Sequence, residues 1–219
     1  MLSYGAKRLY FLAAAPLMYA NGLAYRAFRQ PRTPIRVHLG PGKTNYIPDW
    51  VNVDANPFTA KVDLWANFAN RLPFRDNSVA AVYSHHVIEH IRDDALPRHF
   101  GELFRVLIPG GAVRIGGPNA DGAMRKYLEG DAGWFSDYPR NRASIGGRMV
   151  NFVFCANEHM TALTPSYLEE LMTGAGFAAP KICLPTRDSA YFGREVLDKE
   201  WESDFATPHT LIVEARKPD

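Results

Sequence analysis

The stretch "IRVHLGPG", Ile35 to Gly42, decides the fold, because a short apolar run ends there in a glycine turn. This pattern is typical of a buried parallel strand with a loop at its carboxyl end. The stretch "WVNVD", Trp50 to Asp54, repeats the pattern and ends on an acidic residue, and "VAAVYS", Val79 to Ser84, repeats it again. We therefore expect three buried strands of this kind.

Helical patterns alternate with the strands further along the chain. Apolar residues at helical spacing from Leu96 to Leu107 predict a helix that the sequence "IPGG" stops. Thr164 is a predicted N-cap, with Pro165 at the first position of a helix that ends near Gly174 and Gly176. Further strands are predicted at "AVRIGG" (112–117), "KICLP" (181–185) and "HTLIVEARK" (209–217). This alternation predicts an α/β protein with a doubly wound, mostly parallel sheet.

Composition narrows the class of protein. A chain of 219 residues that is 47% hydrophobic and 22% charged fits one ordinary globular domain. The two cysteines, Cys155 and Cys183, are too few for a disulfide framework and lack a C-x-x-C spacing, so we expect a reducing, cytoplasmic compartment. Basic residues are scattered and no nucleic-acid motif is present, so we expect no nucleic-acid partner.

Residues 1–36 differ from the rest in charge, because basic residues accumulate there before the first acidic residue, Asp49. The uncharged run "LYFLAAAPLMYANGLAY", Leu9 to Tyr25, lies between the basic flanks. It falls short of the roughly 20 apolar residues that a membrane span needs. A helix that packs on the domain is the first interpretation. Peripheral contact with the inner membrane face is the second, and a cleaved signal peptide is the third.

The segment "SHHVIEH", Ser84 to His90, concentrates polar side chains behind the third strand. His86, Glu89 and His90 read as H-x-x-E-H, which on a helix places two imidazoles one turn apart for zinc. No third ligand follows at metalloprotease spacing, so the sequence predicts no bound metal, and a divalent ion at Glu89 and His90 is a minor alternative. A structural role is the main alternative, with one side chain capping a helix and the other packing under the sheet edge.

These unusual residues all lie at the carboxyl ends of predicted strands, where ligands bind in a doubly wound sheet. The turn Gly40-Pro41-Gly42 allows a ligand to approach the backbone, and Asp54 offers two acceptor oxygens to a ribose diol. Asp54 follows Gly42 by only 12 residues, short of the ~20 of a nicotinamide-binding unit. A nucleoside without a diphosphate therefore fits better than NAD, with an ordinary tight turn as the structural alternative.

The ordered series "VHLGPG", "VNVD", "LPFRDNSVAAVYSHHVIEHI", "RVLIPGG", "EHMTALTPSYLEELMTGAGF" and "LIVEARK" resembles class I S-adenosylmethionine-dependent methyltransferases. The closest similarity is to small bacterial methyltransferase-domain proteins of type 11, which are linked to sugar and polysaccharide pathways. The resemblance implies a Rossmann-like, seven-stranded sheet over residues 35–219, preceded by an apolar and basic helical extension at 1–34. It also implies S-adenosyl-L-methionine as the cofactor.

The resemblance assigns roles to particular positions. In that family the glycine turn wraps the amino-acid portion of the cofactor, the residue matching Asp54 binds the ribose, and the residue matching Asn67 faces the adenine. The matching cofactor-binding positions are Gly40, Pro41, Gly42, Asp54, Asn67, Ser84 and His85. This chain departs from the family at His38, where an acid is common, and in its short link from Gly42 to Trp50, which trims the first crossover helix.

The resemblance implies methyl transfer to a small-molecule or glycan acceptor, and we expect transfer to oxygen. A hydroxyl acceptor needs a base, for which His86 and His159 are the candidates; His159 also fits a structural role. Aromatic and arginine side chains within residues 119–160 predict a lid-like insertion that selects the substrate. The alternative is a non-catalytic scaffold of the same fold, docked on a membrane-associated glycan-assembly complex through residues 1–36.

Overall fold

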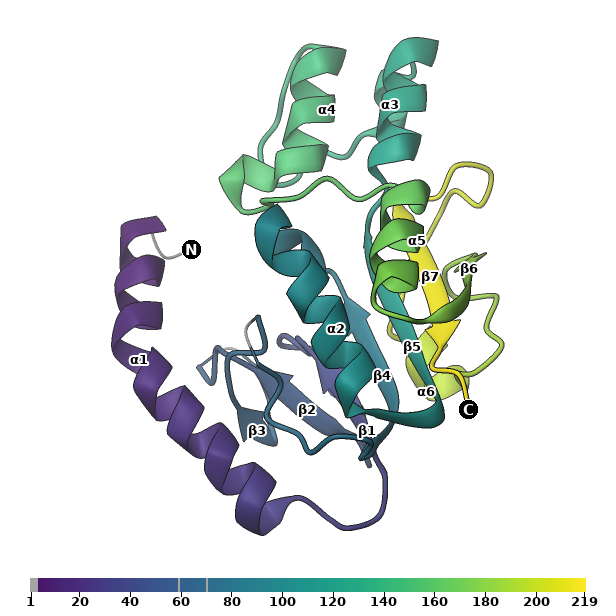
Figure 1. Cartoon of the computed structure of the whole chain (residues 1–219). Coiled ribbons are helices and arrows are strands. Elements are labelled where there is room, and N and C mark those ends of the chain that lie inside the picture. Colours follow the sequence, from purple (N-terminus) through teal and green to yellow (C-terminus); the bar gives the residue numbers. More distant parts are fainter. Residues whose placement is uncertain (1–3, 59, 70) are drawn as a thin grey trace.

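The computed structural model describes residues 4–58, 60–69 and 71–219, and a seven-stranded sheet forms its centre (Figure 1). The strand order is β3-β2-β1-β4-β5-β7-β6, and β7 runs antiparallel to both of its neighbours while the other pairs are parallel. The strands are β1 (Ile35–Leu39), β2 (Val51–Asp54), β3 (Leu64–Trp65), β4 (Val79–His85), β5 (Leu107–Pro118), β6 (Ala178–Cys183) and β7 (Thr210–Arg216). This arrangement confirms the predicted doubly wound, mostly parallel sheet.

The α-helices of the described residues are α1 (Tyr4–Ala24), α2 (Leu96–Val106), α3 (Ala120–Glu129), α4 (Ile145–Phe154), α5 (Pro165–Gly174) and α6 (Arg194–Leu197). Helices α2 and α5 begin where the sequence predicts. The hydroxyl of Thr164 accepts a hydrogen bond from the backbone N–H of Tyr167, which makes it the N-cap of α5.

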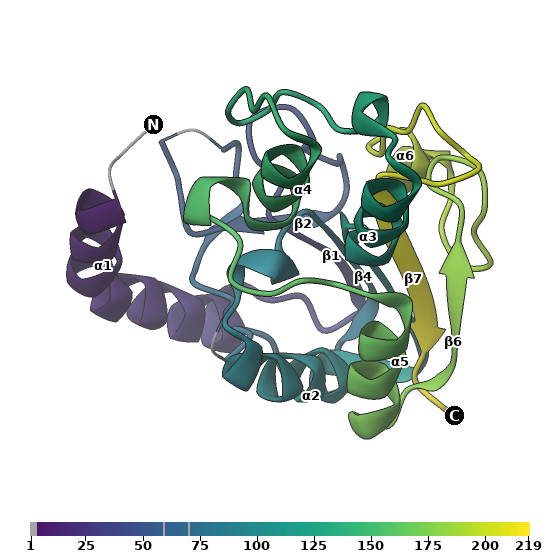
Figure 2. The same cartoon turned by 90° about the horizontal axis from the view of Figure 1, so that it is seen from above.

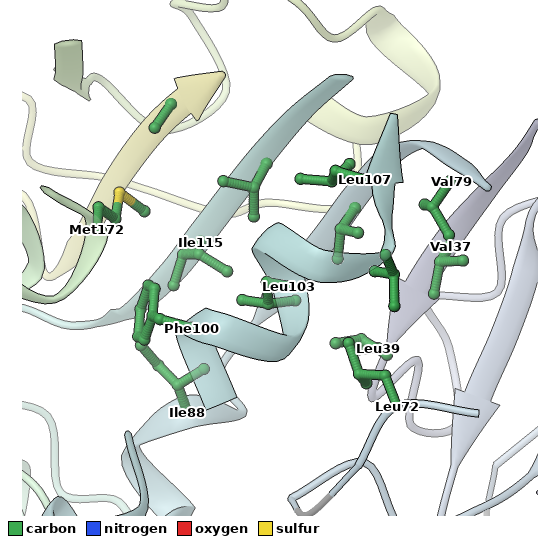
Figure 3. Close-up of a cluster of buried hydrophobic side chains, with 14 of the residues drawn as sticks. Val37, Leu39, Leu72, Val79, Ile88, Phe100, Leu103, Leu107, Ile115 and Met172 are labelled. Carbon is green, nitrogen blue, oxygen red and sulfur yellow. The ribbon is translucent and has the colours of Figure 1, made fainter. Parts of the chain in front are cut away.

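One face of the sheet is covered by α2 and α5, which enclose the main hydrophobic core. Phe100 and Leu103 of α2 point into this core and face Ile115 of β5 (Figure 3). Leu39 of β1 lies in the same cluster and is fully buried. The helical spacing of apolar residues in α2 therefore has its cause in packing against the sheet.

The opposite face of the sheet is covered in a different way. Residues 40–50, all described, form turns and no helix, in agreement with the short link in the sequence. Tyr83 of β4 is instead buried by Ile47 and Trp50 from this link and by Val196 and Leu197 of α6. The connection between β6 and β7 thus takes the place of a crossover helix.

A buried ion-pair network fixes that connection to the sheet. The guanidinium of Arg114 on β5 donates two hydrogen bonds to Glu200, at 2.6 and 2.8 Å, and one of 2.6 Å to Glu214 on β7. The side chains of all three residues are fully buried. Such buried charges persist because they are paired and hydrogen-bonded.

Helix α1 lies along the β3 edge of the sheet (Figure 1). Ala14 and Met18 are buried against the domain, and the side-chain amide of Asn21 donates a 2.8 Å hydrogen bond to the carbonyl of Trp65. Other apolar side chains of the helix stay exposed, among them Leu9, Leu12, Leu17, Tyr19 and Leu23. In the part of the chain that the structure describes, no helix has the length and hydropathy required to cross a membrane.

Candidate active site

A pocket of about 1220 Å³ opens at the carboxyl ends of β1 and β4. Helices α3 and α4 form a separate layer above these strand ends (Figures 1 and 2). Most of the lining comes from residues within the segments 40–45, 85–90, 131–139, 151–159 and 199–210. The pocket therefore lies between the sheet and the segment that the sequence predicts to be lid-like.

The glycine turn forms one wall of the pocket, with Gly40, Pro41 and Gly42 all in the lining. Gly40 and Gly42 have positive φ angles of 71° and 55°, which glycine adopts without strain. A Cβ on Gly40 would lie 2.3 Å from Cγ2 of Val87, so only glycine fits there. This bare backbone suits the close approach of a cofactor's amino-acid portion.

Asp54 and Asn67 lie outside the residues that line this pocket. Asp54, at the end of β2, accepts a 2.8 Å hydrogen bond from the backbone N–H of Asn56. Its pKa is raised, because partial burial outweighs the hydrogen bonds from backbone N–H groups. Asn67 lines a separate cavity of about 130 Å³ beside α1, and its side-chain oxygen accepts a hydrogen bond from the backbone N–H of Ala69.

Ser84 is buried and His85 is half-buried at the end of β4. The hydroxyl of Ser84 and Nε2 of His85 have no hydrogen-bond partner among the described residues. His85 lines the pocket and its ring stacks on Tyr83, with centroids 6.1 Å apart. Burial holds the pKa of His85 well below its ordinary value, so this imidazole is neutral at pH 7.

His86 projects into the pocket from a left-handed backbone position, with φ of 54°. Its Nδ1 lies 3.2 Å from Oε1 of Glu89, and its Nε2 lies 3.5 Å from the hydroxyl of Thr210. Residues Ile88–His90 form a single 3₁₀ turn instead of an α-helix. The H-x-x-E-H spacing therefore does not place His86 and His90 one helical turn apart.

Glu89 is the centre of a cluster of histidines. Its Oε1 lies 4.0 Å from Nε2 of His90 and 4.0 Å from Nε2 of His159, in addition to the contact with His86. Burial favours protonation of Glu89, but the hydrogen bond with His86 and the neighbouring histidines hold its pKa below the ordinary value. The structure thus brings both predicted catalytic histidines, His86 and His159, onto one buried carboxylate.

The pocket lining contains a second polar group, around His209, that sequence reasoning missed. The ring of His209 stacks on Trp134, with centroids 4.2 Å apart, and its two nitrogens lie 2.8 Å from Glu202 and from the carbonyl of Trp134. Burial by itself lowers the pKa of His209, but the hydrogen bonds to Glu202 and to the carbonyl of Trp134 outweigh burial and raise the pKa above its ordinary value. The sequence offered one indication that His209 lies in the pocket, which is its position at the start of the last predicted strand.

Solved structures define the class of this fold. A methyltransferase from Thermotoga maritima, described as a "possible histamine N-methyltransferase", is 17% identical with a TM-score of 0.54, over 98% of this chain and 96% of its own. An S-adenosylmethionine-dependent methyltransferase from Archaeoglobus fulgidus is 16% identical with a TM-score of 0.52, over 95% and 99%. Phosphoethanolamine N-methyltransferase 2 from Haemonchus contortus, solved with S-adenosylmethionine, is 15% identical with a TM-score of 0.50, over 92% and 53%. The fold is that of the class I methyltransferases.

The sequence itself gives the more specific assignment. Residues 49–115 match the family described as "Methyltransferase domain", which here comprises β2 to β4, the histidine segment, α2 and most of β5. This match and the shared fold confirm the resemblance noted in the sequence. The chain thus has the fold of class I S-adenosylmethionine-dependent methyltransferases, and its residues 49–115 match a methyltransferase family. No curated protein matches it.

Proposed function

We propose that the enzyme methylates a hydroxyl group of a saccharide or other small molecule, bound between the histidine cluster and the layer of α3 and α4. The observation that carries this proposal is the pairing of His86 with buried Glu89 at the pocket wall. The carboxylate accepts the Nδ1 proton of His86, so that Nε2, which lies 3.5 Å from the hydroxyl of Thr210, carries the lone pair. That is the arrangement of an oriented general base, which a hydroxyl acceptor needs because its proton must leave as the new bond forms, whereas a neutral amine attacks through its free lone pair.

The chemistry requires one proton to be removed from the acceptor. S-Adenosylmethionine supplies an electrophilic methyl group on a sulfonium sulfur, which keeps the bonding electron pair when the methyl leaves. As the acceptor oxygen forms its bond to the methyl carbon, Nε2 of His86 accepts the hydroxyl proton. Glu89 then stabilises the resulting imidazolium. His159, whose Nε2 lies 4.0 Å from the same carboxylate oxygen, adds a second neutral imidazole, since burial lowers its pKa.

We propose that the turn of Gly40, Pro41 and Gly42 binds the amino-acid portion of the cofactor. Ser84 and His85 are proposed to line the wall of the cofactor site beside this turn. Asp54 is proposed to bind the ribose, because β2 ends beside β1 and its carboxylate interacts with the backbone N–H of Gly42. Asn67 follows β3, the next strand outward, and is proposed to face the adenine.

Residues 119–160 are proposed to select the acceptor. Tyr138 is 67% exposed and lines the pocket, so its ring is available for stacking on a sugar face. Its backbone carbonyl accepts a 2.6 Å hydrogen bond from Asn151 of α4, which ties the loop to the helix. Arg148 donates to the carbonyl of Phe135 at 3.2 Å and braces the same loop.

The test of the function has two arms on the full-length protein. Calorimetric titration with S-adenosylmethionine, with NAD as the control, should give binding that Asp54→Ala weakens; equal binding by this variant refutes the ribose role. Methyl transfer from labelled cofactor to matched hydroxyl and amine acceptors should favour the hydroxyl. Replacing His86 by alanine should lower that turnover by about 10²–10⁴-fold. Cofactor binding without turnover on any acceptor would favour the scaffold alternative.

We further propose that α1 contacts an anionic membrane surface. Exposed apolar side chains on α1 are followed by Phe28, which is 87% exposed, and by exposed Arg29 and Arg32. Apolar side chains beside basic ones suit a surface of anionic headgroups.

Flotation with anionic and with neutral vesicles tests this contact. The full chain should float with anionic vesicles only, and Leu9→Glu with Leu12→Glu should abolish it. Equal flotation of this variant would contradict the proposal. A deletion of α1 is a poorer test, because it uncovers the surface that Ala14 and Met18 bury.

A further inference from the structure

We infer that Glu89, His90 and His159 bind a divalent first-row transition-metal ion at the wall of the pocket. One carboxylate oxygen and one nitrogen of each imidazole lie within 4.8 Å of one another. Two imidazoles and a carboxylate are a donor set that suits zinc, iron, cobalt or manganese ions. The ligands come from the segment after β4 and from the end of the α4 segment, so the fold, not the local spacing, creates the site.

The hydrogen bonds of the two histidines prepare them as ligands. Nδ1 of His90 lies 2.8 Å from the carbonyl of Glu158, and Nδ1 of His159 lies 2.9 Å from the carbonyl of Val153. A carbonyl can only accept, so each Nδ1 carries the proton and each Nε2 presents a lone pair. Both Nε2 atoms face Oε1 of Glu89. Metal-binding histidines are typically oriented in this way, by donating the other ring N–H to a carbonyl or carboxylate.

The burial of the Glu89 carboxylate is a second, independent observation that indicates a bound cation. Its side chain is 1% exposed, and its Oε2 has no hydrogen-bond partner within the described part of the chain. A buried carboxylate oxygen without a partner is costly, by about 1–3 kcal/mol or more for a charged group. A cation that the carboxylate binds with both oxygens would remove that cost. A capping role does not explain Glu89, because its side chain caps neither of the nearby 3₁₀ turns nor the start of α2.

The distances require only a small closure of the site. Two ligand atoms at about 2.1 Å from one ion are separated by roughly 3.0–3.4 Å in octahedral or tetrahedral geometry. The two Nε2 to Oε1 distances of 4.0 Å are therefore too long by up to about 1 Å. Rotation of the half-exposed His90 ring shortens one of them, and a shift of the Glu89 carboxylate toward the His159 ring shortens the other. Three protein ligands leave further coordination positions toward the pocket.

The sequence indicated a divalent ion at Glu89 and His90 only as a minor alternative, because the third ligand is remote. His159 follows His90 by 69 residues and belongs to a different loop. The rings of these two histidines nevertheless pack edge to face, with centroids 4.9 Å apart. The expectation of no metal followed from the absence of a nearby third ligand, and the fold supplies one.

An ion at this place would bind the acceptor oxygen beside His86, whose Nδ1 already lies 3.2 Å from Glu89. This consequence rests on the proposed function. Metal binding by the three ligands does not, because it follows from their geometry alone. The two ideas are separated by measuring binding directly in the absence of any acceptor.

The experiment is titration of the chelator-treated, full-length protein with Zn²⁺ by calorimetry and with Co²⁺ by visible absorption. We expect one ion per chain and a Co²⁺ spectrum typical of nitrogen and oxygen ligands. His90→Ala and His159→Ala should each weaken binding by more than about tenfold. Glu158→Gln, which keeps the backbone carbonyl that orients His90, is the matched control and should bind like the unmodified protein.

The outcomes distinguish the two proposals. His86→Ala should lose turnover and keep the ion, because His86 is not one of the three ligands. Absence of Zn²⁺ and Co²⁺ binding, or unchanged binding by both His90→Ala and His159→Ala, would overturn the metal site. Because the His90 side chain is 44% exposed, its alanine variant remains folded and keeps the test valid even if His159→Ala does not fold.

Discussion

Replacement of Arg114 by methionine should destabilise the protein more than any surface charge change. The substitution removes the three hydrogen bonds to Glu200 and Glu214 and a fourth, of 2.9 Å, to the carbonyl of Asp188. It leaves two fully buried carboxylates without their cation. Breaking a buried ion pair by removing one partner costs about 3–5 kcal/mol.

The matched control is Arg36→Met. This substitution breaks an ion pair between Arg36 on β1 and Glu195 on α6, which belongs, like Glu200, to the connection between β6 and β7. Arg36 and Glu195 are 3.6 Å apart, and their side chains are 44% and 43% exposed. Exposed pairs of this kind contribute only about 0–1 kcal/mol. Urea unfolding at pH 7, followed by circular dichroism, should therefore separate the two variants by several kcal/mol.

A third variant tests the cause of the loss. Combining Arg114→Met with Glu200→Gln and Glu214→Gln should recover part of the lost stability, because the cost arises from uncompensated buried charge. A destabilisation of Arg114→Met no larger than that of Arg36→Met would refute this reasoning. So would a triple variant that is less stable than Arg114→Met.

Three further predictions concern the pocket. Gly40→Ala should lower cofactor affinity and stability more than Gly42→Ala, since a Cβ on Gly40 meets a neighbour at 2.3 Å while no described atom lies within 4 Å of one on Gly42; calorimetry and urea unfolding compare them. His209→Gln should destabilise most between pH 4.5 and 6.5, the ordinary pKa values of the two partners. Glu202 has a lowered pKa in the folded protein, so the stability that it contributes is lost as pH falls through that pKa. His209 has a raised pKa in the folded protein, so the stability that it contributes is lost as pH rises through that pKa. A stability difference between His209→Gln and the unmodified protein that does not change with pH would contradict the pairing. Tyr138→Ala should reduce acceptor turnover while leaving cofactor affinity unchanged, and equal losses in both assays would count against acceptor selection by this loop.

Much of the fold was predictable because local patterns and packing agree. Strand β1 ends before the predicted glycine turn, and α2 and α5 begin at the expected residues, where apolar spacing and the Thr164 cap are explicit in the sequence. Strand β3 has only two residues and gave no periodic signal. Helix α4 contains Gly146 and Gly147, whose low helix propensity hides its pattern.

The sequence predicts which loops at the strand ends line the candidate site. It does not predict the contacts between residues that are far apart in the chain. The glycine turn and His86 line the pocket, since strand ends in a parallel sheet meet at one edge. Asp54 and Asn67 lie outside the lining, and the meeting of His159 with Glu89 depends on how the α4 segment folds back. Sequence spacing carries no information about such a contact.

The covering of Tyr83 by the β6–β7 connection has a consequence for biosynthesis. During translation, Ile47, Trp50 and Tyr83 emerge from the ribosome long before Val196 and Leu197, which bury them. The nascent chain therefore exposes these apolar side chains until α6 has been made. Contacts so distant in sequence slow folding, and exposed apolar surface favours aggregation and chaperone binding. Synthesis of α6, and not of the N-terminal half, is the event that permits this face of the sheet to be covered.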